Sequence, residues 1–155
     1  MKTLIIGANG FTGRRILQHL SLCGGYELTG CSLHKDIQPE SNTRFVQADI
    51  NDHPAIGRLI GEMRPDVVIN ASALSVPDYC ESHHEEAHAA NVLAVENMVR
   101  CCEQEGSRFI HLSTDFVFDG KNRSLYIEED IPAPVNYYGL SKYQGELAVA
   151  ANCSN

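Results

Sequence analysis

The residues best suited to chemistry are a tyrosine and a lysine four positions apart, Tyr138 and Lys142, in the segment NYYGLSKYQGE. At this spacing the two side chains share one face of a helix. A free phenol has a pKa of about 10, and a neighbouring ammonium lowers it, so a tyrosine beside a lysine can serve as a general acid or base. The alternative is an ordinary surface helix in which two polar residues happen to be four apart.

A glycine-rich turn near the N-terminus gives a second sign of a site. Gly7, Gly10 and Gly13 follow a short apolar run and precede a segment with helical periodicity, and Asn9 and Phe11 lie in the same turn. In dinucleotide-binding turns the first glycine permits the tight turn, the second lets the backbone approach a pyrophosphate, and the third allows close packing of helix on strand. We therefore expect a dinucleotide there, bound at the helix N-terminus. A turn that binds nothing is the alternative.

The end of the second predicted strand indicates which cofactor is bound. A carboxylate at this position would bind a ribose 2′-hydroxyl and repel a 2′-phosphate. The sequence has Ser32 there, with His34 and Lys35 close behind, and the first acid is Asp36. Arg14 is a further cation for a phosphate. This pattern favours NADP(H), with NAD(H) as the alternative, and the competing interpretation is a solvated loop.

An acidic residue follows the third predicted strand. Asp49 and Ile50 are placed to flank an adenine, and the Asp49 carboxylate can accept a hydrogen bond from its exocyclic amine. Capping of the next helix by Asp49 or Asp52 is the competing role.

Small and polar residues end the fourth and fifth predicted strands. Ala71, Ser72 and Ala73 would let a cofactor lie against the backbone, and the Thr114 hydroxyl would face the same crevice. In open α/β sheets, ligands bind outside the carboxyl ends of the strands. We therefore expect these residues to meet the tyrosine–lysine pair.

The elements that must position these residues alternate between strand and helix. Apolar runs predict strands at 2–7, 26–33, 44–50, 65–73 and 108–114, and helical periodicity predicts helices at 11–24, 54–63, 81–105 and from 136 to the last residue. The link between the second and third strands is too irregular to be helical. Such alternation is typical of an α/β fold with a doubly wound parallel sheet (Rossmann-type) and strand order 3-2-1-4-5.

The composition restricts the class of protein. The chain has 155 residues and a net charge of −8, with scattered cations, which argues against a nucleic-acid surface. No apolar run is long enough to span a membrane. Six cysteines without regular spacing indicate reduced thiols in a cytoplasmic protein. Cys80, His84 and His88 fall at helical spacing, but nothing else converges on them, and we expect no metal site.

Together the motifs resemble the extended short-chain dehydrogenase/reductases, and within them the dTDP-4-dehydrorhamnose reductase family. The motifs are the glycine turn, Asp49-Ile50, the segment Asn70-Ala71-Ser72-Ala73, STDFVFDG, EEDIPAPVNYYG and the tyrosine–lysine pair. The resemblance implies that Thr114 binds a substrate carbonyl, that Tyr138 donates the proton, and that Lys142 binds the nicotinamide ribose and tunes the tyrosine. It also implies that Asn91 helps to hold the site, whereas a buried, hydrogen-bonded asparagine is its plain interpretation.

The resemblance also suggests how much of the protein is present. We expect residues 1–155 to form one NAD(P)-binding domain, the N-terminal part of a longer protein, without the later strands and the small substrate domain of its relatives.

The resulting hypothesis is an NADP(H)-dependent reductase of a 4-keto nucleotide sugar, which passes hydride to a ketone while a tyrosine protonates the oxygen. One alternative is a non-catalytic, NADP-binding regulatory subunit like that of methionine adenosyltransferase. Another is a different extended short-chain reductase or a nucleotide-sugar epimerase. The expected partner is a nucleotide-sugar substrate, with neither nucleic acid nor membrane, and a homodimer is left open.

Overall fold

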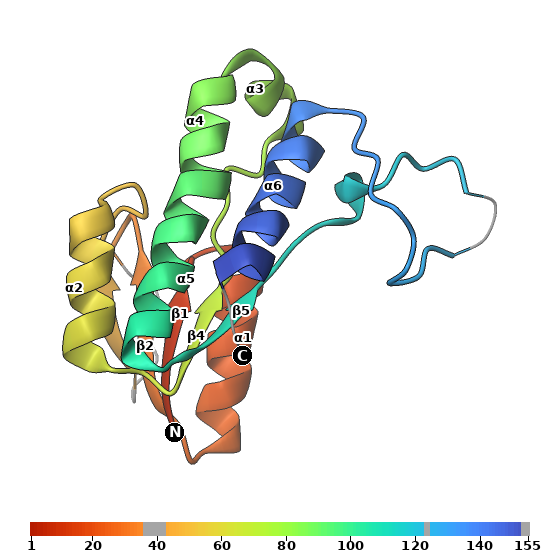
Figure 1. The fold of residues 1–155 in the computed structure, drawn as a ribbon. Coiled ribbons are helices and arrows are strands. Elements are labelled where there is room, and N and C mark those ends of the chain that lie inside the picture. Colours follow the sequence, from red (N-terminus) through yellow and green to blue (C-terminus); the bar gives the residue numbers. More distant parts are fainter. Residues whose placement is uncertain (36–42, 123–124, 153–155) are drawn as a thin grey trace.

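The computed structural model describes residues 1–35, 43–122 and 125–152, which fold around a five-stranded parallel sheet (Figure 1). The strands are β1 (Lys2–Ile6), β2 (Glu27–Ser32), β3 (Thr43–Gln47), β4 (Val67–Asn70) and β5 (Arg108–His111). Their order is β3-β2-β1-β4-β5, so the predicted doubly wound topology is confirmed. The irregular link expected between the second and third strands falls largely on 36–42, outside the described residues.

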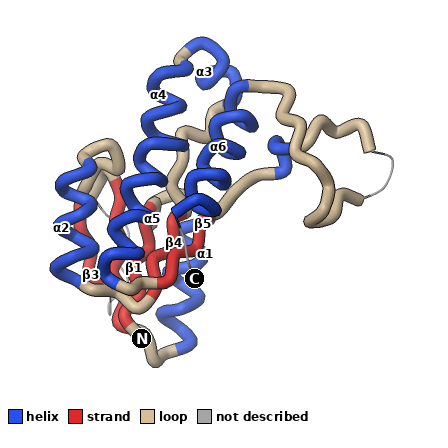
Figure 2. Tube along the Cα trace, viewed as in Figure 1, coloured by secondary structure: helices blue, strands red, loops and turns tan. Residues whose placement is uncertain are grey.

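Helices cover both faces of the sheet (Figure 2). They are α1 (Phe11–Cys23), α2 (His53–Met63), α3 (Pro77–Ser82), α4 (His84–His88), the π-helix η1 (Ala89–Leu93), α5 (Ala94–Glu105), the 3₁₀ turn η2 (Asp115–Val117) and α6 (Tyr137–Asn152). None of the helices in the described residues is long and apolar enough to cross a membrane.

The side chains of β1 point alternately to the two faces of the sheet, and each face packs against different helices. Leu4 and Ile6 are fully buried in the core that α2 and α5 complete, whereas Ile5 belongs to a smaller cluster with Leu17 of α1. Successive side chains of a strand point to opposite faces, so both faces of this strand must be apolar. The result is one layer of helix on each side of the sheet, with the strand ends free to carry a site.

The helix predicted over 81–105 is present from His84 to Glu105, but it is not one regular α-helix. The chain forms α3 and α4 with a break at His83, whose φ of −131° and ψ of 60° are not helical, and then the π-helix η1 before α5. The predicted apolar face is nevertheless present, since Val92, Val95 and Val99 are buried. Apolar spacing reports which side chains face the core, and it does not detect a wider turn.

Candidate cofactor and active site

One cavity of about 520 Å³ opens at the carboxyl edge of the sheet. It joins segments far apart in the sequence, because the N-terminal glycine turn and the last helix line the same space. Of the residues singled out from the sequence, those in the lining are Gly7, Gly10, Phe11, Ser32, Asp49, Ile50, Ala71, Ser72, Ala73, Tyr138 and Lys142. The crevice expected at the strand ends is therefore present, and it contains both members of the tyrosine–lysine pair.

The three glycines differ in what their backbones require. Gly7 has a φ of +82°, and a Cβ on it would lie 2.7 Å from the backbone of Ala71. A Cβ on Gly13 would lie 2.2 Å from the carbonyl oxygen of Gly7, so this residue allows α1 to approach β1. Gly10 precedes α1 and lines the cavity, with only that same oxygen near a Cβ, at 3.2 Å. The turn has the geometry that was expected of a dinucleotide turn.

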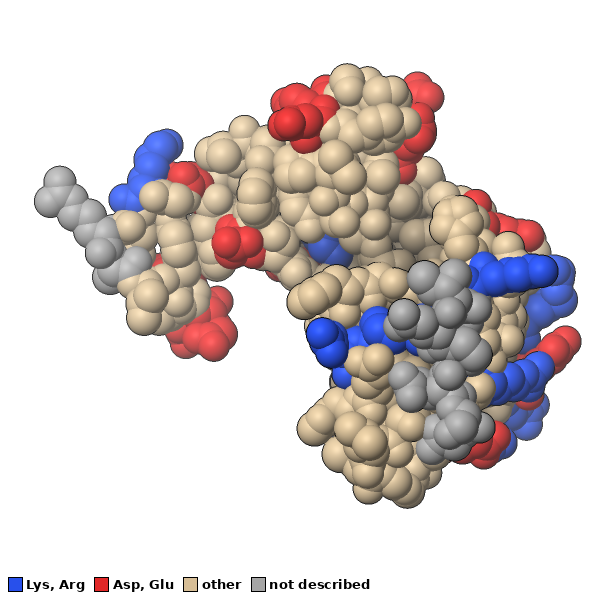
Figure 3. All heavy atoms as spheres, turned by 180° about the vertical axis from the view of Figure 1, so that it is seen from behind, with Lys and Arg blue, Asp and Glu red and all other residues tan. Residues whose placement is uncertain are grey.

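Asn9 ties the glycine turn to the loop after β2. Its Nδ2 donates to the carbonyl oxygens of His34 and Lys35, at 2.9 and 3.0 Å, and its Oδ1 accepts from Arg14 at 2.9 Å. These four residues lie beside the cavity rather than in its lining. Seen from behind, Lys and Arg atoms gather in and below the hollow on this face (Figure 3). The arrangement brings Arg14 and the backbone of His34 and Lys35 together around Asn9.

The two aspartates after β3 have separate roles. Asp52 caps α2 by accepting from the backbone of Ala55 at 3.0 Å, whereas Asp49 accepts from the backbone of Asn51 at 2.9 Å and lines the cavity. The capping role, which the sequence left open between them, therefore belongs to Asp52.

Tyr138 and Lys142 lie one turn apart on α6 and both line the cavity. The Tyr138 ring packs edge-on against Phe116, with 5.6 Å between ring centroids. The Lys142 side chain is 2% exposed, and its Nζ donates to the carbonyl oxygen of Leu112 at 2.7 Å. Burial lowers the pKa of Lys142 to about 8, and the nearby Glu146 carboxylate opposes that shift. A buried lysine with a lowered pKa is a feature of functional sites.

Two polar residues of the site were missed from the sequence. His111 ends β5 and its Nε2 lies 3.1 Å from Lys142 Nζ, while Ser113 lines the cavity and donates to Glu146. A histidine between the apolar residues of FIHL, at the strand end where ligands bind, is the signal that could have revealed the first.

Asn91 lies in the π-helix η1 and is 1% exposed. Its Oδ1 accepts from the backbone of Leu74 at 2.8 Å, and its Nδ2 donates to the Leu74 carbonyl and to Ser141 Oγ, at 3.1 and 2.9 Å. Ser141 in turn donates to the carbonyl oxygen of Tyr138. Asn91 therefore supports the site from outside the cavity lining, by joining the loop after β4 to the helix that carries Tyr138.

Thr114 also lies outside the cavity lining. Its Oγ1 accepts from the backbone of Phe116 at 3.3 Å and donates to Asp115, so it caps the 3₁₀ turn η2. Its neighbour Ser113 presents the hydroxyl that lines the cavity.

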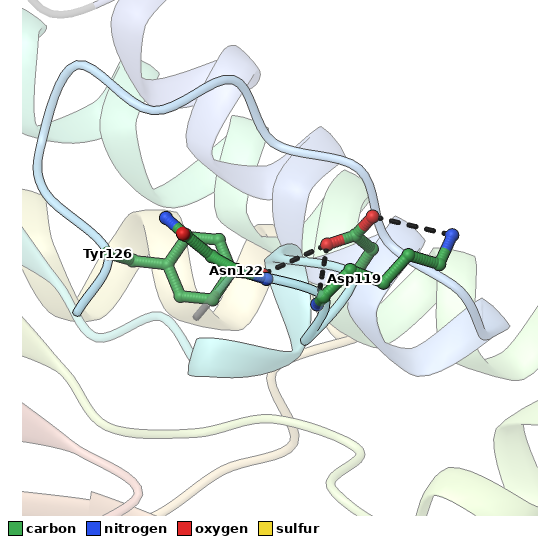
Figure 4. Close-up of polar contacts among 4 residues, drawn as sticks. Asp119, Asn122 and Tyr126 are labelled. Carbon is green, nitrogen blue, oxygen red and sulfur yellow. Dashed lines mark hydrogen bonds and ion pairs between the residues drawn. The ribbon is translucent and has the colours of Figure 1, made fainter. Parts of the chain in front are cut away.

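The chain between η2 and α6 leaves the body of the domain as a long loop. Figure 4 shows how part of it is held: the Tyr126 hydroxyl donates to Asp119 at 2.9 Å and accepts from the backbone of Asn122 at 3.2 Å. Phe118 stacks on Tyr126 at 4.3 Å. In the acidic segment that follows, Ile131 is 87% exposed.

The break at His83 separates Cys80 from His84 and His88, so the three residues considered as metal ligands do not lie on one helix. Cys80 lies in α3, where its Sγ donates to the Leu74 carbonyl, and His84 begins α4 and stacks on Tyr137. No group of metal-ligating side chains occurs in the parts of the chain that the structure describes.

These features define a Rossmann-type domain with its cavity at the carboxyl edge of the sheet. The chain belongs to the family described as the RmlD substrate binding domain, whose family model matches residues 1–155. The resemblance drawn from the motifs is thus confirmed.

Similar proteins include dTDP-4-dehydrorhamnose reductases and a subunit of methionine adenosyltransferase. A dTDP-4-dehydrorhamnose reductase of Burkholderia thailandensis is 37% identical over 97% of this chain and 46% of its own length. Methionine adenosyltransferase 2 subunit beta of Rattus norvegicus is 34% identical over 97% of this chain and 43% of its own. The crystal structure of dTDP-4-dehydrorhamnose reductase from Bacillus anthracis in complex with NADP has a TM-score of 0.81 and 27% identity, over 97% and 49%. The chain spans about half the length of these relatives.

Proposed function

We propose that this chain is the cofactor-binding part of an NADP(H)-dependent reductase of a 4-keto nucleotide sugar. The observation that carries the proposal is the single cavity lined by both the glycine turn and the Tyr138–Lys142 pair. The residues fit the cofactor: Gly10 leaves room at the start of α1, and Asn9 holds the backbone of His34 and Lys35 and the side chain of Arg14. The loop that follows Ser32 has no carboxylate in its described part. The reductase names of relatives and the NADP in one related structure support it.

The bound cofactor would supply a hydride. Gly7, Gly10 and Phe11 would hold its phosphates at the α1 N-terminus. Asp49 and Ile50 would flank its adenine, and the small residues Ala71–Ala73 would let it lie against the backbone. Tyr138 would donate its hydroxyl proton to the ketone oxygen of the sugar, and Lys142 would contact the ribose. The Thr114 hydroxyl is assigned to the substrate carbonyl, and Ser113, which lines the cavity, is the rival for that role.

Titration of this chain with NADPH and NADH, followed by nicotinamide fluorescence, tests the cofactor assignment. We expect saturable binding with a preference for NADPH. A preference for NADH would contradict the choice of cofactor, and binding of neither would contradict a working cofactor site. Tyr138→Phe removes only the hydroxyl and should leave NADPH binding within about twofold of the parent value.

The reductase assignment needs turnover. In the protein to which this chain belongs, NADPH oxidation with a 4-keto nucleotide sugar should fall at least 100-fold in Tyr138→Phe, the usual weight of a general acid. The second candidate is a regulatory subunit, which the similarity to methionine adenosyltransferase 2 subunit beta favours. Copurification with a larger enzyme subunit, together with unchanged turnover in Tyr138→Phe, would support that candidate instead.

A further inference from the structure

A chain of three polar side chains, with its two ends buried and its middle member half-buried, runs from β4 through β5 to α6. Asn70 Nδ2 lies 3.1 Å from Nδ1 of His111, and His111 Nε2 lies 3.1 Å from Nζ of Lys142. Asn70 and Lys142 are 1% and 2% exposed, so each group depends on its protein partners for hydrogen bonds. The position of the protons along this chain can therefore be worked out from the contacts.

The first step is the orientation of the Asn70 amide. Its Oδ1 accepts from the backbone N–H of Ser72 at 3.0 Å and from the Ser72 hydroxyl at 2.6 Å. A backbone N–H can only donate, so the oxygen of the amide must face Ser72 and the NH₂ group must face His111. Nδ1 of His111 is consequently the acceptor in this contact.

The second step is the tautomer of His111. Burial, and to a smaller extent the charge of Lys142, lowers the pKa of His111 to about 3, so the ring is neutral at ordinary pH. A neutral imidazole carries one proton, and with Nδ1 accepting, that proton must be on Nε2. The N–H group of Nε2 then points at Lys142.

The third step concerns Lys142. A neutral amine has a lone pair to accept from Nε2–H and can still donate to the Leu112 carbonyl. An ammonium has no lone pair, so in that state the His111 contact would bring two donors together. We propose that His111 is a positioning residue that offers Nε2–H to Lys142 and so favours the neutral amine of that lysine.

The other titratable groups near α6 do not favour the neutral form of Lys142 in the way that His111 does. Glu146, one turn further along α6, favours the charged lysine, and it is also the acceptor for Ser113. Glu81 of α3 accepts from the backbone of Tyr137, and His84 of α4 stacks on the Tyr137 ring, both at the start of the helix. Tyr138 lines the same cavity as Lys142. Lys142 is thus placed between a carboxylate that favours its proton and an imidazole that disfavours it.

The consequence for chemistry rests on the function proposed above. After Tyr138 has given its proton to the sugar oxygen, the phenolate must regain one, and the Lys142 ammonium can supply it and become the neutral amine. Because His111 stabilises that amine, it makes the lysine a better proton donor to the phenolate. Solvent then restores the ammonium.

The test is nitrogen-15 NMR of the 155-residue chain without cofactor. We expect His111 to be protonated on Nε2 and not on Nδ1, and the Lys142 side chain to titrate near pH 8. The Nδ1-protonated tautomer would overturn the proposal by itself. Neither measurement requires a bound dinucleotide, so failure to bind NADPH would count against the proposed function and not against this inference.

Asn70→Asp should reverse the direction of the hydrogen bonds that His111 makes. A carboxylate accepts from both Ser72 and His111, so the proton should move to Nδ1, and Nε2 should then accept from a Lys142 ammonium. We expect the lysine midpoint to rise by more than about one pH unit. The same substitution in a His111→Leu background adds the charge without the imidazole and should give a smaller rise. Equal rises in the two backgrounds would overturn the proposal. If Asn70→Asp does not fold, the tautomer of the parent chain still decides.

Discussion

Gly145 of α6 lies against the carbonyl oxygen of Asn91 in the π-helix η1, where a Cβ on the glycine would approach that oxygen to 2.5 Å. The helix that carries Tyr138 and Lys142 therefore packs backbone to backbone on the π-helix, and only a residue without a side chain fits between them.

Replacement of Gly145 should separate the two helices. We expect Gly145→Ala to lower the free energy of unfolding by about 1–3 kcal/mol, because the added methyl group overpacks the contact. Urea unfolding measures this effect. The matched control is Gly61→Ala on α2, where the nearest atom to a Cβ is 3.7 Å away. There alanine should be neutral or stabilise by up to about 1 kcal/mol, and similar losses at both positions would contradict the packing argument.

Asn91 and Ser141 should behave as a coupled pair. Asn91→Ala leaves the part-buried Leu74 N–H without its acceptor and removes the donor to the buried Ser141 Oγ, which should cost about 2–4 kcal/mol of unfolding free energy. Ser141→Ala should cost about 1 kcal/mol. A double-mutant cycle by urea unfolding should give a coupling energy of at least about 0.5 kcal/mol, whereas strictly additive losses would mean that the hydrogen bond contributes nothing.

His111 should make the protein sensitive to acid. Its pKa is 6.5 when exposed and about 3 in the fold, so between these values the unfolded chain binds a proton that the folded chain does not. The free energy of unfolding should therefore be fully retained above pH 6.5. It should fall as the pH drops towards 3, by up to about 1.4 kcal/mol per pH unit from this residue.

His111→Gln removes this titration while an amide can still bridge Asn70 and Lys142. The variant should lose less stability than the parent between pH 7.5 and 4.5, measured by urea unfolding at each pH. His19→Gln, at an exposed histidine of α1, provides the control. If the two variants show the same pH dependence, His111 is not the residue responsible.

Ser32 should control the choice between the two cofactors. Ser32→Asp places a carboxylate where β2 ends, which should weaken NADPH binding about tenfold or more and leave NADH binding unchanged or tighter. Fluorescence titration with both cofactors gives the ratio. Ser75→Asp adds the same charge to the cavity on the loop after β4, and it should affect both cofactors alike. An unchanged ratio in Ser32→Asp would place the 2′-phosphate elsewhere.

The parts of this fold that follow from local chemistry could be predicted from the sequence. The strand order follows from alternating apolar segments, and the roles of Gly7 and Gly13 follow from the turn they form. The shared cavity of Tyr138 and Lys142 follows from helical spacing and the rule for strand ends. The resemblance to the reductase family rested on the same residues.

What could not be predicted depends on contacts between distant segments. The break at His83 and the π-helix cannot be seen in the apolar pattern, because Val92 of η1 is buried as Val95 and Val99 of α5 are. The contact of His111 with Lys142 needs β5 and α6 to be placed to within about an ångström, and spacing along one chain gives no such distance. Likewise, Thr114 and Ser113 are adjacent in the sequence, and only the folded structure shows that Ser113 lines the cavity.

Asn9 joins the glycine turn to the loop after Ser32 with two hydrogen bonds, and it accepts a third from Arg14 of α1. The two segments therefore cannot adjust independently of each other. In the proposed cofactor site, a change that reshapes this loop to accept a different ribose should therefore also alter how the turn holds the pyrophosphate, which both cofactors share. We expect Asn9→Ala to uncouple the preference between the cofactors from the affinity for both.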